Sequence, residues 1–482
     1  MPRFLLLFSG ALLWSYCLLA QDAHYWSSNY GPSVLLTPGS VIASSRDSGV
    51  LFYNPALLSL SNKNRIAISS ITANIYQLEA IKVTNGTGAG RHLRSTSMRI
   101  VPQMLSGSIS LGKKAPVVIA YALINSPGFR FLSSQRRDER FNVLDDDYSP
   151  GPEYFVGDYV VENRVSETTA LLSTGFKLTP KLSAGISVEG QIHQQHYSQT
   201  SNARALANSN IDSSQLPLVS TNTYYLANYV QAGLRFKAGL AYDMGRHHLG
   251  LVVSSPLVRL WGRGSIVADE EINNLRLVPD ADIFLSLLAN TRQEGLRARW
   301  RMPVSIAAGY ALDFRRAQLY LATEYFFRVK DYDILTPRKE AFIRPDTGIN
   351  NTETYSLLRL HDARKAVMNV ALGASYQLKP SITAYASVRT DMSYADRALN
   401  ADGTTSYNAY WNNVHLALGA NFKRQKFNFR TGFLLSYGLT HKYPQDINFD
   451  MPAEENFLQG NPVNTKARRL GAGFMLSYIH NL

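Results

Sequence analysis

The chain has 482 residues, of which 45% are hydrophobic, 11% aromatic and 18% charged, and its formal net charge is +13. This length excludes a single small domain, and the mean hydropathy of -0.14 shows that apolar residues are not gathered into long blocks. Beyond the N-terminal segment, no stretch approaches the roughly 18 apolar residues of a transmembrane helix, and the helix and strand signals do not alternate as in an α/β enzyme.

Residues 1–20 are predicted to be a cleavable export signal. Arg3 supplies a short positive region, and residues 4–20 form the apolar region that follows it. Cleavage after Ala20 and cleavage after Ala23 both fit the sequence.

The only cysteine, Cys17, lies within this signal. Tyr16 is too bulky for the position before a lipidated cysteine, which argues against a lipoprotein. We therefore expect a mature chain without disulfides or cysteine-based metal sites.

Residues 21–64 lie ahead of the first predicted strand. They begin with His24-Tyr25-Trp26 and contain Asp47, Gly49 and the tripeptide Asn54-Pro55-Ala56. Proline fixes φ and favours an extended residue before it, while an Asn side chain can hydrogen-bond exposed backbone groups. The segment is interpreted either as a turn into the first strand or as a hatch inside a barrel.

Short turns divide the rest of the chain into strands. Six are predicted, at 112–116, 179–181, 243–246, 313–316, 378–380 and 423–425, each between apolar runs. With one further strand at 65–82 and one at 466–482, the total is about fourteen, an even number as in single-chain bacterial barrels.

The strands alternate with a period of two. In 381–391, Ala386 and Val388 take one face while Ser387, Arg389 and Asp391 take the other. The same pattern recurs in 182–195, 317–330, 427–437 and the final strand, which ends in Leu482. A soluble sandwich would also alternate, but strands of about ten residues or more are long enough to cross a bilayer. The prediction is an all-β, 14-stranded antiparallel transmembrane β-barrel over residues 65–482.

Seven long connections, predicted at 83–98, 126–158, 198–224, 262–300, 331–355, 392–411 and 441–464, alternate with the short turns, as extracellular loops do with periplasmic turns. In the 262–300 connection, Ile283, Phe284, Leu287 and Leu288 have helical spacing, which predicts an amphipathic helix over the barrel mouth. Phe129 and Phe131 are further candidates for ligand contact there. For both sets, packing among loops is the alternative.

Polar residues are expected on the lumen side. Parity places there Glu189, Arg235, Glu324, Arg328, Arg389 and Arg430, together with Gln191, His193, Lys237, Asp391, His415 and Asn428. Both signs of charge are present, so ion-paired ladders are favoured over binding of a ligand carboxylate by single arginines.

The basic charge does not indicate nucleic acid, because lysines and arginines are not clustered beside stacking aromatics. Contact with outer-membrane lipid and lipopolysaccharide and attraction of fatty anions are more natural uses. No phosphate-binding loop, Gly-x-Ser-x-Gly nucleophile motif or metal-ligand spacing is found, so no enzyme activity, cofactor or metal is expected.

The region around Asn54-Pro55-Ala56 resembles the N-terminal hatch of the FadL family of outer-membrane transporters, which includes TodX-like transporters of hydrophobic compounds. The His24-Tyr25-Trp26 start is similar to the Bacteroidota branch. The resemblance covers roughly residues 24–60. It implies a hatch over 21–64, capture of hydrophobic molecules among the extracellular loops, a pocket near the mature N-terminus with His24, Tyr25 and Trp26 as candidate ligand contacts, and a lateral route opened by a kinked strand.

The expected function is therefore passive uptake of hydrophobic small molecules, long-chain fatty acids or similar, by a monomeric barrel in a Gram-negative outer membrane. Two alternatives remain. One is a FadL-related barrel that holds cargo or a partner for a protein-secretion system, and the other is a general or haem-associated porin.

Overall fold

A computed structural model describes residues 23–26, 41–44, 50–60, 67–111, 117–126, 128–208, 217–276, 284–344, 355, 358–400, 404–406 and 409–481. This part of the chain is mostly β-strand, and none of its helices has the length and apolar character needed to cross a membrane. The predicted export signal lies outside the described residues.

The helical elements are short: α2 (Val50–Tyr53), η1 (Pro55–Leu60), η3 (Ala398–Asn400) and η4 (Glu454–Asn456). The strands are β1 (Ala67–Val83), β2 (Leu93–Leu111), β3 (Val117–Ser126), β4 (Arg130–Phe141), β5 (Glu153–Lys177), β6 (Leu182–Leu206), β7 (Leu218–Asp243), β8 (His247–Ser254), β9 (Val258–Arg276), β10 (Phe284–Arg297), β11 (Ser305–Asp313), β12 (Ala317–Phe326), β13 (Val329–Leu335), β14 (Ile343–Arg344), β15 (Leu360–Arg364), β16 (Val367–Lys379), β17 (Ile382–Asp391), β18 (Asn412–Lys423), β19 (Phe427–Pro444) and β20 (Asn464–Asn481).

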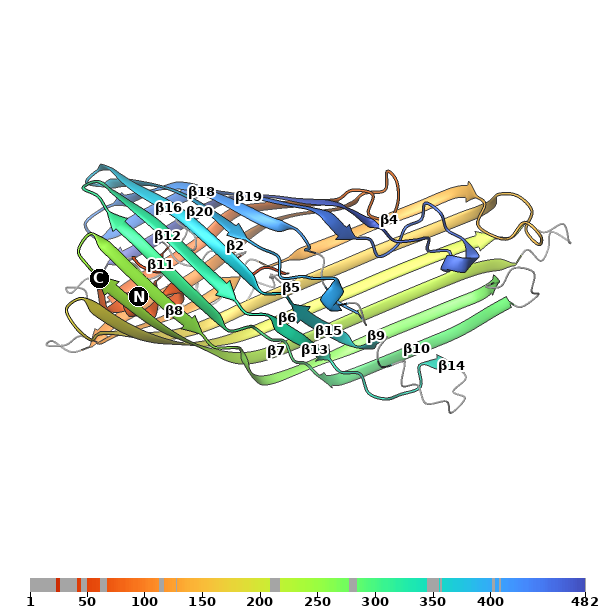
Figure 1. The fold of residues 1–482 in the computed structure, drawn as a ribbon, viewed down its shortest axis with the longest axis horizontal. Helices are drawn as coiled ribbons and strands as arrows, with labels where there is room; N and C mark the ends of the chain where they lie inside the picture. The colour runs from red at the N-terminus through yellow and green to blue at the C-terminus, as the bar shows by residue number, and fades with distance from the viewer. Residues whose placement is uncertain are drawn as a thin grey trace, which may run out of the picture.

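The main sheet is antiparallel and closes on itself (Figure 1). Its last strand, β20, pairs back with β1 from Ile68–Asn481 to Val83–Ala467. At four positions around the barrel, two segments share the place of one strand. β3 and β4 both pair with β5, and β8 and β9 both pair with β7. β11 and β10 follow one another along β8 and β9, and β12 and β14 follow one another along β11 and β10. The described strands of this sheet thus occupy fourteen positions around a barrel, in agreement with the count from the hairpins.

The predicted short turns lie where strands meet in hairpins. Residues 179–181, 243–246, 313–316, 378–380 and 423–425 each fall at such a junction, while 112–116 lie outside the described residues.

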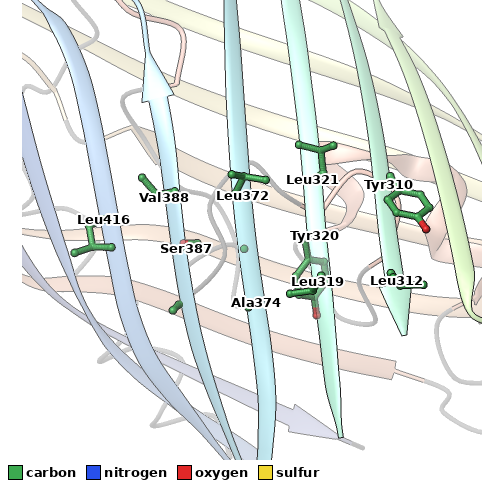
Figure 2. A pocket seen from close by; sticks show the side chains of 12 residues that line it. Tyr310, Leu312, Leu319, Tyr320, Leu321, Leu372, Ala374, Ser387, Val388 and Leu416 are labelled. Carbon is green, nitrogen blue, oxygen red and sulfur yellow. The ribbon is translucent and has the colours of Figure 1, made fainter. Parts of the chain in front are cut away.

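The outer face of the barrel carries an apolar belt. Leu321, Leu372, Val388 and Leu416 are register neighbours on four adjacent strands, and each is between 40% and 51% exposed. Figure 2 shows them around a shallow groove of about 520 Å³ on the wall. Contiguous exposed leucines of this kind require an apolar solvent, which on a closed barrel is lipid.

Several strands are much longer than a bilayer requires. β5, β6 and β7 have 25, 25 and 26 residues, whereas β17 has 10, and Figure 1 shows the long strands continuing past the ends of the short ones. The connections predicted at 126–158, 198–224 and 262–300 are therefore wrong over much of their length, whereas in 331–355 only 331–335 and 343–344 are strand among the described residues. Many of the outward residues there are polar, so the alternation of apolar with polar residues weakens although the strands continue.

The predicted helix over the barrel mouth is also wrong. Phe284, Leu287 and Leu288 belong to β10, which pairs with β9. Phe284 and Leu288 are exposed on the outer face, and Leu287 packs against the interior cluster. Strand pairing decides the structure here, because helical spacing in so short a segment also fits a strand with a period of two. Ile283 lies outside the described residues.

The lipid-facing belt makes a testable prediction on β16. Replacing Leu372 by Arg places a charge in the middle of the belt and should destabilise the barrel by about 2–4 kcal/mol, whereas Leu378→Arg, at the turn end of the same strand, should cost about 0–1 kcal/mol. Equilibrium unfolding in lipid bilayers measures both values. Equal losses for the two variants would contradict a lipid-facing belt.

Candidate functional site

The N-terminal segment lies inside the barrel on a band of glycines. Gly175, Gly185 and Gly239 are register neighbours on β5, β6 and β7, and a Cβ atom at any of them would collide with Asn54, Pro55 or Leu58. The missing side chains allow the backbone of the segment to approach the wall closely.

Two further glycines extend this contact. Gly250 and Gly309 are register neighbours on β8 and β11, and a Cβ atom at either would collide with Ile42 or Ala43. We refer to Gly175, Gly185, Gly239, Gly250 and Gly309 as the glycine band.

Asn54 fixes the segment in place and is fully buried. Its Nδ2 donates to the carbonyl oxygens of Ile42 at 2.8 Å and Leu240 at 3.1 Å, and its Oδ1 accepts from the Ala56 N–H at 3.1 Å. Asn54 thus joins two parts of the N-terminal segment to the wall. The predicted hatch residues Asn54, Pro55 and Ala56 lie together in the lumen, while Asp47 and Gly49 lie outside the described residues.

The start of the described chain is bound deeper in the barrel. His24 Nε2 lies 2.8 Å from the Trp411 carbonyl oxygen, the Trp26 N–H donates to Asp391 Oδ1 at 2.9 Å, and its indole N–H donates to Glu324 Oε2 at 2.7 Å. Each contact joins residues 23–26 to the barrel, so the candidate ligand contacts His24 and Trp26 have a defined position.

Tyr25 packs beside a buried arginine. Its ring stacks on Phe326 with centroids 4.1 Å apart. Arg364 lies over the rings of Tyr394 and Trp300, at 4.5 and 5.2 Å, and donates to Asp362 at 2.8 Å. This buried ion pair compensates the charge of Arg364, which would otherwise be costly away from water.

A small chamber separates the two parts of the N-terminal segment. Its free volume is about 80 Å³. Its lining combines apolar and charged side chains, which include Tyr25, Trp26, Phe52, Met302 and Phe326 and also Glu189, Arg235, Lys237, Glu324 and Arg389. Lys237 Nζ lies 2.5 Å from Glu189 Oε1 and donates to the Phe52 carbonyl at 2.9 Å, so a lumen ion pair also holds the N-terminal segment.

Most of the predicted lumen residues face the interior. Glu189, Arg235, Arg389 and Arg430 are buried, and Glu324 binds Trp26. Arg328 is exposed, so its prediction is wrong. The reason is that β12 ends at Phe326, and parity cannot be continued through the irregular residues that follow.

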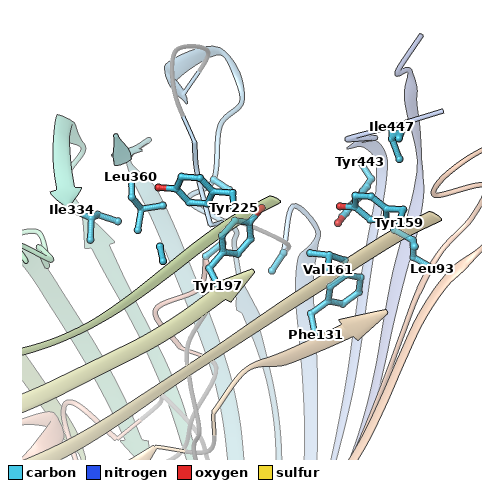
Figure 3. Close-up of a cluster of buried hydrophobic side chains, with 14 of the residues drawn as sticks. Leu93, Phe131, Tyr159, Val161, Tyr197, Tyr225, Ile334, Leu360, Tyr443 and Ile447 are labelled. Atoms are coloured by element: carbon cyan, nitrogen blue, oxygen red, sulfur yellow. The ribbon is translucent and has the colours of Figure 1, made fainter. Parts of the chain in front are cut away.

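The mouth of the barrel is lined by aromatic residues. Figure 3 shows Phe131, Tyr159, Tyr197, Tyr225 and Tyr443 in one buried cluster. The sequence-predicted candidates Phe129 and Phe131 both belong to it.

The 445–463 connection crosses this mouth. Glu454 accepts from the Tyr148 hydroxyl at 2.6 Å and from the Arg276 N–H at 2.9 Å, on the opposite wall. Asp446 accepts from the Tyr159 hydroxyl, and burial raises the pKa of this carboxyl group above its usual range. The connection therefore acts as a cover bound through carboxylates.

One seam in the wall has an incomplete ladder. Among the described residues, β2 pairs with β3 only from Leu111–Val117 to Met104–Ile124, and no ladder joins the rest of β2 to β4. Side chains bridge this seam: the Leu132 N–H donates to Ser95 Oγ at 3.1 Å, and the Arg94 N–H to Ser133 Oγ at 2.8 Å. Such a seam separates more easily than a continuous ladder.

The glycine band was missed from the sequence. Its signal is visible in retrospect: the five glycines fall at inward parity near the short turns, on strands that are otherwise regular. Glycine weakens a strand interior and often marks close approach of another backbone.

Solved structures of similar fold span nearly the whole chain. A Pseudomonas aeruginosa FadL homologue aligns with a TM-score of 0.58 at 13% identity, over 95% of this chain and 100% of that chain. The Pseudomonas putida toluene transporter TodX gives 0.57 at 15%, over 96% and 100%, and the Ralstonia pickettii toluene transporter TbuX gives 0.52 at 13%, over 94% and 98%. No family model and no curated protein matches the sequence. The chain therefore has the antiparallel β-barrel fold of these proteins.

The glycine band can be tested by adding one methyl group. Gly185→Ala should displace the segment around Pro55 and give resolved ion-conducting steps in planar bilayers, with the barrel still heat-modifiable on gels. Gly190→Ala is the matched control on the same strand, because its Cβ would meet no atom closer than 3.8 Å. Silent bilayers for both variants would contradict a lumen obstructed by this segment.

Proposed function

We propose that this protein is an outer-membrane channel for passive uptake of hydrophobic small molecules, with long-chain fatty acids or similar compounds as substrates. The observation that carries the proposal is the N-terminal segment on the glycine band. Barrels larger than eight strands have room for an aqueous passage, so a segment that fills this lumen opposes free flow of polar solutes. TodX and TbuX are described as toluene transporters, which supports the same ligand class.

The proposed organisation follows from this function. Residues 1–20 are the export signal, 21–64 the hatch, and 65–482 a monomeric barrel without catalytic activity. We place the chain in the Bacteroidota branch of the FadL family, on the basis of the His24-Tyr25-Trp26 start and Asn54-Pro55-Ala56.

The proposed route begins at the aromatic mouth and reaches the chamber beside Tyr25 and Trp26. Sites for drug-sized ligands have volumes of about 300–1,000 Å³, whereas the chamber has about 80 Å³. Passage therefore requires movement of 23–26 or 50–60. The incomplete ladder between β2 and β4 supports a lateral exit, because fewer backbone hydrogen bonds must break there.

Uptake into proteoliposomes tests the route, with oleate and toluene as probes. Ala307 is buried and lines the chamber, whereas Ala308 faces outward on the same strand. Ala307→Phe should reduce uptake of both probes toward the rate of protein-free liposomes, and Ala308→Phe should leave it unchanged.

The alternatives give different results in the same preparation. A porin would pass small ions freely through the wild-type protein and show no uptake preference for apolar probes. A secretion scaffold would retain a partner protein on native purification and transport neither probe. Either outcome would contradict the transport proposal.

A further inference from the structure

Three exposed arginines gather on the outer face of the barrel, away from the lumen, and a fourth, Arg259, is partly buried beside them. Arg263 on β9 and Arg297 on β10 are direct register partners, and both are exposed. Arg259 Nε donates to the Ala298 carbonyl oxygen at 2.7 Å, and Ala298 lies between Arg297 and Arg299 in the chain. We refer to Arg259, Arg263, Arg297 and Arg299 as the arginine patch.

The patch has no neutralising carboxylate among the described residues. None of its guanidinium groups lies within ion-pair distance of an acidic side chain there, and the neighbouring outward acid, Glu294, is paired with Arg292 at 2.7 Å. Arg259 is fixed by the carbonyls of Ala298 and Gly262, which are uncharged. Like charges in this arrangement repel one another, so an anion bound from outside would stabilise the patch.

The height of the patch on the wall identifies the anion. β8 and β11, which start from short turns, have 8 and 9 residues, and about 9–11 residues of a tilted strand cross the hydrocarbon. Arg259 and Arg263 lie 5 and 9 residues after the end of β8, and Arg299 and Arg297 lie 6 and 8 residues before the start of β11. Trp261, exposed beside them, is a residue type enriched at membrane interfaces. The patch therefore lies at the headgroup level of the leaflet opposite the short turns.

A groove of about 660 Å³, lined by both polar and apolar atoms, adjoins the patch. Its outward lining includes Arg164, Gln194, His196, Asn228, Arg263 and Glu294. Arg164, His196 and Asn228 are register neighbours across β5, β6 and β7, and His196 Nδ1 lies 2.6 Å from Asn228 Oδ1. Amide, imidazole and carboxylate groups beside guanidinium groups suit a molecule that carries both hydroxyl groups and phosphates.

We propose that the arginine patch and this groove bind the phosphorylated sugar headgroup of lipopolysaccharide in the outer leaflet. Arginine suits phosphate because its planar guanidinium donates two parallel hydrogen bonds, and the polar side chains of the groove would accept hydrogen bonds from or donate them to the adjoining sugars. This surface faces away from the chamber, so the inference is independent of the transport route.

Binding of purified lipopolysaccharide to the detergent-solubilised protein tests the proposal. Arg263→Gln, Arg297→Gln and Arg299→Gln together should weaken binding by at least about tenfold, because each charge-assisted contact contributes about that factor or more. The matched control is Arg136→Gln, Arg140→Gln and Arg204→Gln, which removes the same charge from the outer wall. Arg136 and Arg204 already have carboxylate partners, and Arg140 packs on Tyr154. The control should bind as the wild type does.

Dephosphorylated lipopolysaccharide gives a second measurement that requires no variant. The wild-type protein should bind it about as weakly as the patch variant binds the phosphorylated form. Equal binding of the two lipids, or undiminished binding by a folded patch variant, would overturn the proposal. Uptake of oleate by the patch variant should remain normal, so failure here is distinguishable from failure of the transport proposal.

Discussion

The structure depends on closing the sheet between β1 and β20. In lipid, each backbone N–H and C=O group must find a partner within the protein, and a strand barrel achieves this only when it has no free edge. The first and last strands pair along almost their full length. Closure then fixes the two faces of every strand, because side chains alternate between lipid and lumen. The leucine belt and the buried charged residues follow from this one constraint.

Closure also creates the lumen that the rest of the molecule must fill. Fourteen strand positions enclose more space than their own side chains occupy. The described parts of the N-terminal segment lie in this lumen and approach the wall closely where glycines replace side chains. Hydrogen bonds from Asn54 to Leu240, from Lys237 to Phe52 and from Trp26 to Glu324 hold that segment at separate points of the wall. Residues 23–26 and 50–60 contact different strands, β12 and β17 in the first case and β7 in the second.

The sequence predicts those features that depend on neighbours along the chain. Hairpin turns and the period of two gave the strand count and the orientation of residues such as Ser387 and Arg389, since each strand carries its own pattern. Contacts between segments that are far apart in the chain were harder to predict from the sequence. The glycine band becomes meaningful only when five strands lie side by side, and Arg328 was misplaced because parity does not cross a strand end.

Amide hydrogen exchange in lipid nanodiscs, followed by mass spectrometry, tests the central claim of a closed barrel filled by its own N-terminal segment. The account predicts that β20 exchanges as slowly as the central strands β6 and β7, and that residues 50–60 are protected as well. Rapid exchange of β20 would contradict closure, and rapid exchange of 50–60 beside a protected β20 would contradict a lumen filled by that segment.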